Sequence, residues 1–134
     1  MLFRSVLLRM EDDIVPWLAG AADGALPAGA PRFRPGLGLC VVLAAAGYPG
    51  KVRSGDVIAG LGADGGLGAG EAVVFHAGSK QEGGRFLTAG GRVLGVAAAG
   101  RDLEEARAHA YGAIDRISWP GMHYRKDIGL RGRA

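Results

Sequence analysis

The sequence predicts an α+β fold, in which an antiparallel sheet has a helix packed on one face and is preceded by a separate N-terminal helix. Two observations support this prediction. Several short apolar stretches typical of strands, separated by glycine-rich turns, come before a single well-capped helical segment. A segment rich in proline and glycine separates the first helical stretch from everything after it. The length of 134 residues suits one domain and a short extra element.

The N-terminal segment is expected to be helical from about Val6 to Ala22, because apolar residues recur there with acidic residues between them. Pro16 lies inside this run, and we expect it to kink the helix or to start a second turn. The stretch "DGALPAGAPRFRPG" that follows has the composition of a linker. We therefore divide the chain into residues 1–26, a linker at 27–35, and a domain at 36–134.

The middle of the chain is expected to supply the strands. "GLCVVLAAA", "DVIAGL", "AVVFHAG" and the two halves of "RFLTAGGRVLGVAAAG" are the candidates. The last two are expected to form a tight hairpin through Ala89, Gly90 and Gly91, and Pro49-Gly50 suits the centre of a type II turn. "GADGGLGAG" is interpreted as a loop, because its further glycines are poor helix formers, although it contains the spacing G-x-G-x-x-G.

The clearest helix is predicted from Asp102 to Ile117. Asp102 can cap its first turn, and Glu105 follows at the spacing of a capping box. Apolar residues then fall on one face of the helix: Leu103, Ala106, Ala110, Ile114 and Ile117.

Composition excludes several classes of protein. The single cysteine, Cys40, allows no disulfide framework, and we interpret it as a buried strand thiol in a reducing, cytoplasmic setting. The first residues are not expected to be a signal peptide, and the longest apolar run is too short to cross a membrane. No His, Cys or acidic residues show metal-ligand spacing, and no nucleophile arrangement is visible.

The net charge of +3 suits an anionic partner without proving one. Glycine turns can bring backbone N–H groups close to an anion, and Gly50, Gly90 and Gly91 are the candidates. Arg92, Arg125 and Lys126 could then neutralise a phosphate. The alternative remains open that these are ordinary turns with surface charges.

Four segments together resemble a known family: "VVLAAAGYPG", "VVFHAGSK", "TAGGRVLGVAAAG" and "YRKDIG". In this order and at these separations they are similar to the C-terminal domain of phosphoribosylamine–glycine ligases, over roughly Gly36 to Arg131. "VLLRMEDDIVPWLAGAADGAL" looks like the last helix of that family's ATP-grasp domain, so residues 1–26 resemble its remnant. Small departures concern Ala45-Ala46-Gly47, and Val52 or Arg53 where the family often has tyrosine.

The resemblance implies a role in purine biosynthesis, where the family joins 5-phosphoribosylamine and glycine to give glycinamide ribonucleotide with ATP and Mg²⁺ (or Mn²⁺). The family motif Arg-Phe-Gly-Asp-Pro-Glu, which carries metal ligands, is absent from this sequence. We therefore expect no catalytic residues here, and expect ATP and metal to bind outside this chain. The resemblance also implies that Gly90, Gly91 and Arg92 face the phosphoribosylamine site, with Arg125 and Lys126 second and His76 third.

The expected partners are the N-terminal and ATP-grasp domains of the same enzyme, and a homodimer through the exposed interdomain surface. The chain alone should be inactive. A free-standing module that binds a phosphorylated ribose or a protein partner is the alternative. Nucleic acid is not expected, because the basic C-terminal segment has no interleaved aromatic residue apart from Tyr124.

Overall fold

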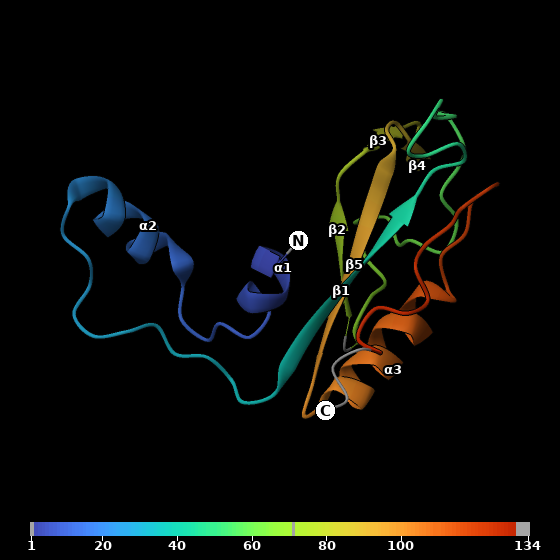
Figure 1. Ribbon diagram of the computed structural model, residues 1–134. Coiled ribbons are helices and arrows are strands. Elements are labelled where there is room, and N and C mark those ends of the chain that lie inside the picture. Colours follow the sequence, from blue (N-terminus) through green and yellow to red (C-terminus); the bar gives the residue numbers. More distant parts are fainter. Residues whose placement is uncertain (1, 71, 131–134) are drawn as a thin grey trace.

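A three-stranded antiparallel sheet forms the centre of the structure, a computed structural model that describes residues 2–70 and 72–130 (Figure 1). Its strands are β1 (Leu37–Ala44), β5 (Arg92–Gly100) and β2 (Ala72–His76), in the order β1-β5-β2. A second sheet pairs β3 (Ser79–Glu82) with β4 (Arg85–Thr88). Helix α3 (Leu103–Ile114) packs on the larger sheet. The predicted α+β class is thus confirmed.

The hydrophobic core lies between α3 and one face of this sheet. Alternate residues of β1 face the helix, namely Leu39, Val41 and Leu43, and they are paired across the ladder with Ala98, Val96 and Leu94 of β5. The helix meets them with small side chains such as Ala106 and Ala110, both fully buried. This allows a close approach: a Cβ added at Gly100 would lie 2.4 Å from the backbone nitrogen of Ala106.

Helix α3 is capped as its sequence predicts. The Asp102 carboxylate accepts a hydrogen bond from the Glu105 backbone N–H at 2.9 Å. The Glu105 carboxylate reaches back to the N–H of Arg101, one residue before the position of a standard capping box. The helix ends at Ile114 instead of the predicted Ile117, although Ile117 remains buried in the core.

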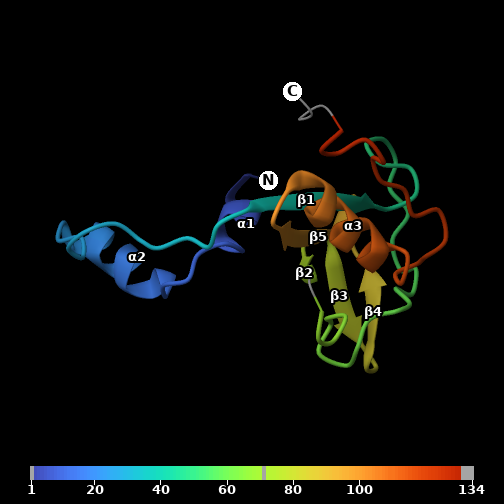
Figure 2. The same ribbon diagram turned by 90° about the horizontal axis from the view of Figure 1, so that it is seen from below.

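The single N-terminal helix predicted over Val6 to Ala22 is wrong in detail. Two helices form, α1 (Leu2–Leu7) and α2 (Ile14–Asp23), because Asp13 caps a new helix by accepting from the Val15 N–H at 2.9 Å. Pro16 then lies in the first turn of α2, where its missing N–H is not needed. Figures 1 and 2 show α1 against the sheet and α2 standing away from it.

The predicted hairpin through Ala89, Gly90 and Gly91 is also wrong. β4 pairs with β3, whereas β5 pairs with β1 and β2, so the chain changes sheet between β4 and β5. The true hairpin turn is at Gly83-Gly84, where both φ angles are positive (56° and 74°), as a two-residue turn of this kind requires. The strand pattern missed β3 because its sequence, SKQE, is polar and largely exposed.

Two smaller expectations fail for related reasons. "DVIAGL" forms only isolated bridges, Val57 to Leu87 and Ala59 to Ser118, and Gly55 and Gly60 around them have positive φ angles. The type II turn at Pro49-Gly50 does not form, since the positive φ lies at Gly47 (86°). "GADGGLGAG" is a loop, as predicted.

The packing of α3 yields a stability prediction with a control on the same helix. Ile114→Ala should lower the free energy of unfolding by about 2–5 kcal/mol, because the fully buried side chain leaves a cavity. Gly112→Ala should raise it by about 0.4–1 kcal/mol, because an added Cβ there meets no atom within 4 Å. Urea unfolding of the two variants measures both changes, and equal stabilities would contradict this account of the core.

Candidate functional site

The segments that connect the two sheets meet at a pair of glycines. The Gly78 N–H donates to Arg92 O at 2.8 Å and the Ala89 N–H donates to Gly78 O at 2.7 Å. A Cβ at Gly78 would lie 2.8 Å from the Cα of Gly90, so Gly78 has no room for a side chain, and a Cβ at Gly90 would lie 3.2 Å from the Cα of Gly78, which is a tight contact. Gly90 therefore serves a close backbone contact and not a hairpin turn.

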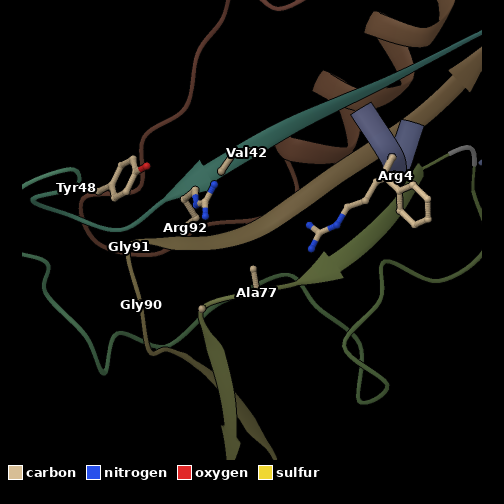
Figure 3. A pocket seen from close by; sticks show the side chains of 9 residues that line it. Arg4, Val42, Tyr48, Ala77, Gly90, Gly91 and Arg92 are labelled. Atoms are coloured by element: carbon tan, nitrogen blue, oxygen red, sulfur yellow. The ribbon is translucent and has the colours of Figure 1, made fainter. Parts of the chain in front are cut away.

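Beside this contact lies a cavity of about 620 Å³, shown in Figure 3. Its wall contains three of the six residues that the sequence singled out, Gly90, Gly91 and Arg92. The other lining residues come from α1, β1, the loop after β1, and the end of β2: Phe3, Arg4, Val42, Tyr48, Ala77 and Gly78. None of these nine residues is acidic, so the cavity presents positive charge only.

A β-bulge directs Arg92 into this cavity. Leu43 pairs with Leu94, but Ala44 pairs with Arg92, so Val93 is an extra residue in the β5 ladder. Without the bulge, Arg92 would share a face with Leu94 and point toward α3. With it, Arg92 lies opposite Ala44 and on the same face as Val42, away from the hydrophobic core.

A second guanidinium reaches the same cavity from α1. Arg4 lies with its Cζ atom 5.1 Å from the centre of the Phe75 ring, a cation–π contact that orients the side chain across the sheet. In Figure 3 both Arg4 and Arg92 extend into the space between α1 and the start of β5. Sequence reasoning missed Arg4, and also Tyr48, because only the packing of α1 and of the loop after β1 brings them here.

The cavity has the chemistry of an anion site. The N–H groups of Gly90 and Gly91 donate to no other described residue, and the side chain of Arg92 has no hydrogen-bond or ion-pair partner among residues 2–70 and 72–130. Backbone N–H groups next to an arginine are well suited to a phosphate group. Two like charges lining one cavity also gain when an anion lies between them.

His76 is not brought to this cavity. It pairs with Leu94 and so lies on the opposite face of the sheet from Arg92. Its Nε2 is 3.0 Å from Gly65 O, and its Nδ1 is 2.7 Å from Ser79 Oγ. Since a carbonyl only accepts, Nε2 carries the proton, and a neutral ring accepts from the Ser79 hydroxyl at Nδ1. His76 therefore joins the glycine-rich loop to β3.

Arg125 and Lys126 do not line the cavity, and they lie on a C-terminal segment that follows α3. The Arg125 guanidinium forms two hydrogen bonds with Asp127, at 2.9 and 2.6 Å, and this pairing raises its pKa. The backbone carbonyl of Arg125 accepts from the Tyr111 hydroxyl at 2.7 Å, which fixes the segment against the helix.

Three further observations bear on the chemistry of the chain. Cys40 is half-buried in β1, less than predicted, and burial raises the pKa of its thiol. Within the described ranges, no three His, Cys, Asp or Glu side chains gather in a way that could hold a metal ion. No helix in this part of the chain has the length and apolar character needed to cross a membrane.

The structure is a small α+β domain with a cavity lined by two arginines, Arg4 and Arg92, and by Gly90 and Gly91. Residues 38–131 match the sequence profile of the family described as phosphoribosylglycinamide synthetase, C domain. The chain belongs to this family and corresponds to its C domain, which confirms the resemblance carried by the four sequence segments.

Individual relatives agree with this assignment. The chain is 48% identical over 130 residues to the phosphoribosylamine–glycine ligase of Caulobacter vibrioides, and 44% identical over 130 residues to that of Mycobacterium tuberculosis. These matches cover 96% of this chain but only 30% and 29% of those proteins. A crystal structure of the Thermotoga maritima phosphoribosylamine–glycine ligase matches with a TM-score of 0.70 and 32% identity, over 85% of this chain and 27% of that one.

The His76 contacts yield a second stability prediction. Gly65→Ala should be more destabilising than Gly68→Ala by at least ~1 kcal/mol, although both positions have positive φ (81° and 77°). A Cβ at Gly65 would lie 2.6 Å from His76 Nε2 and 2.9 Å from the Phe86 ring, whereas at Gly68 it meets nothing within 4 Å. Thermal unfolding of both variants measures the difference, and equal losses would show that the His76 contact adds nothing.

Proposed function

We propose that this chain forms one wall of the phosphoribosylamine site of an ATP-dependent phosphoribosylamine–glycine ligase, in the purine biosynthesis of the cytoplasm. Gly90, Gly91 and Arg92 bind the 5-phosphate of phosphoribosylamine in the 620 Å³ cavity, and Arg4 contributes a second positive charge. Arg125, Lys126 and His76 have structural roles, because their side chains or backbones already have partners in the chain.

The observation that carries this proposal is the direction of the Arg92 side chain, which points into the cavity. The bulge at Val93 turns the Arg92 side chain away from the core face of the sheet and into a cavity that Gly90 and Gly91 also line, and the N–H groups of these glycines donate to no other described residue. A phosphate group accepts hydrogen bonds from a planar guanidinium and from backbone amides at once. The names of the relatives specify phosphoribosylamine as a substrate. Its phosphate is negatively charged and complements the positive charge of Arg4 and Arg92.

The ATP and Mg²⁺ of the ligase reaction belong outside this chain. Mg²⁺ prefers carboxylate and phosphate oxygens in octahedral geometry, and the lining of the cavity contributes no carboxylate. The residues described here do not fit the metal, so the contribution of the chain is to bind and orient the substrate phosphate. Positioning of this kind accounts for much of the catalysis of phosphoryl transfer.

Helix α2 supplies the surface for the partner domains. Val15 and Leu18 of α2 are 63% and 58% exposed, and Leu26, three residues after the helix, is 65% exposed. Large apolar side chains that gather in the open in this way mark an interaction surface. The chain spans about 30% of the length of its relatives, so we infer that the remaining length covers α2 and Leu26. Without that cover, the same apolar side chains favour a homodimer.

Arg92 gives a direct test of the phosphate site. Ribose 5-phosphate, added in chloride buffer, should shift the amide NMR signals of Gly90 and Gly91 in a saturable way. Arg92→Gln should weaken this binding about tenfold, because it removes a charge-assisted hydrogen bond. Arg85→Gln, at the exposed first residue of β4, is the matched control and should bind like the parent chain. Binding that is unchanged in Arg92→Gln would refute the assignment.

Activity tests the partner proposal. The purified chain, given ATP, glycine and phosphoribosylamine, should form no glycinamide ribonucleotide. Addition of the N-terminal 70% or so of the Caulobacter relative should restore product formation, and Leu18→Glu should reduce this by weakening the docking of α2. Product from the chain alone would disprove the proposal, and analytical ultracentrifugation of Leu18→Glu would show whether the same face forms a dimer.

A further inference from the structure

A second basic cavity lies at the other end of β5. It has a volume of about 370 Å³ and is lined by Arg9, Arg34, Pro35, Ala99, Gly100, Arg101, Glu105 and His109. Arg92 begins β5 and Gly100 ends it, so eight steps of about 3.4 Å separate the two cavities by roughly 27 Å along the strand. This cavity is therefore distinct from the site of the proposed function.

The charges around this cavity do not balance. Three arginines line it, and Glu105 is the single acidic residue among its lining residues. Glu105 is already paired, because its carboxylate oxygens lie 3.0 and 3.1 Å from Arg101 Nε, and this pairing lowers the Glu105 pKa. The charges of Arg9 and Arg34 remain, and neither side chain has a carboxylate partner in the described part of the chain.

Arg9 and Arg34 are held in place by each other's chain segment. The Arg9 Nε and Nη2 atoms donate to Arg34 O at 2.9 and 2.8 Å, and Arg34 Nη2 donates to Leu8 O at 3.1 Å. The Arg34 backbone N–H in turn donates to Arg9 O at 2.7 Å. A guanidinium has five N–H donors, so each arginine keeps several for another acceptor. Both groups are thus oriented before any ligand arrives.

His109 adds a group of the same kind. Its Nδ1 lies 2.9 Å from Ala99 O, and because a carbonyl only accepts, Nδ1 carries a proton. This bond holds the ring at the cavity wall. The carbonyl bond leaves Nε2 available to a ligand; Nε2 accepts in the neutral ring and donates to a phosphate oxygen only in the imidazolium form.

We propose that this cavity binds a phosphate group, either inorganic phosphate or a phosphomonoester. A phosphate dianion matches the two uncompensated charges of Arg9 and Arg34, and its three or four oxygens can accept from several guanidinium donors at once. A single carboxylate would balance only one of the two charges. The volume of about 370 Å³ lies within the range of small-molecule sites, with room for a sugar beside the phosphate.

The test uses the full chain and two probes, inorganic phosphate and ribose 5-phosphate, titrated separately in chloride buffer. Both should shift the amide NMR signals of Gly100 and Arg101 in a saturable way. Arg34→Gln should weaken this binding about tenfold, and so should Arg101→Gln, which leaves the Glu105 carboxylate uncompensated. Arg85→Gln is the matched control and should bind like the parent chain. Arg92→Gln should weaken the ligand-induced shifts at Gly90 and Gly91 and leave those at Gly100 and Arg101 unchanged. Tighter binding of ribose 5-phosphate would identify the ligand as a phosphomonoester, and equal binding would identify phosphate itself.

Two results would overturn the proposal: no saturable shift at Gly100 and Arg101 with either probe, or Arg101→Gln binding like the parent chain. Arg101 decides the matter if Arg34→Gln disturbs the fold, because the Arg101 side chain is exposed and its hydrogen bonds and ion pair among the described residues are with Glu105. The amide NMR signals of Met10 and Phe33, which form a backbone bridge, report whether the fold is intact. Failure at this cavity leaves the result at Gly90 and Gly91 unaffected, so the two sites are judged separately.

Discussion

Strand β5 is the constraint on which the rest of the structure depends. It is buried from Val93 to Ala98 and has hydrogen-bonded partners on both sides, so β1 and β2 belong to one sheet only through it. Its small residues near Gly100 let α3 approach closely, and the face away from the core is left to α1. Because both basic cavities lie at its ends, the register of this one strand places both.

Irregular backbone brings several of the charged groups into position, while helix α1 supplies Arg4. A single extra residue at Val93 moves Arg92 from one face of the sheet to the other. Gly78 and Gly90 let two connecting segments touch, and the N–H groups of Gly90 and Gly91 next to Arg92 donate to no other described residue. In the same way, carbonyl groups of an irregular segment hold Arg9 and Arg34. The regular elements therefore form the hydrophobic core, and irregular segments position Arg92, Arg9 and Arg34.

The sequence predicted what depends on local pattern and failed where tertiary contacts decide. The apolar runs of β1, β2 and β5 and the capped helix α3 are strong local signals. The partner of β4 is not local information, since Gly83-Gly84 and Ala89 to Gly91 both permit a turn and only the packing selects one. Gly90, Gly91 and Arg92 were found together because they are adjacent in sequence. Arg4 was missed because it reaches them only through the sheet, and His76 was grouped with them although alternation puts it on the other face.

The attachment of α2 has a consequence for how the chain responds to cleavage. Helix α2 is joined to the rest of the fold by two neighbouring segments, residues 8–13 and 24–36. These segments are bridged at Met10 and Phe33, and Arg32 donates two hydrogen bonds to the Asp12 carboxylate. A protease that cuts the exposed backbone between Gly24 and Ala30 would break one connection only. The N-terminal piece would stay bound through α1 and these bridges, so the nicked chain would run as two fragments under denaturing conditions and as one particle under native ones.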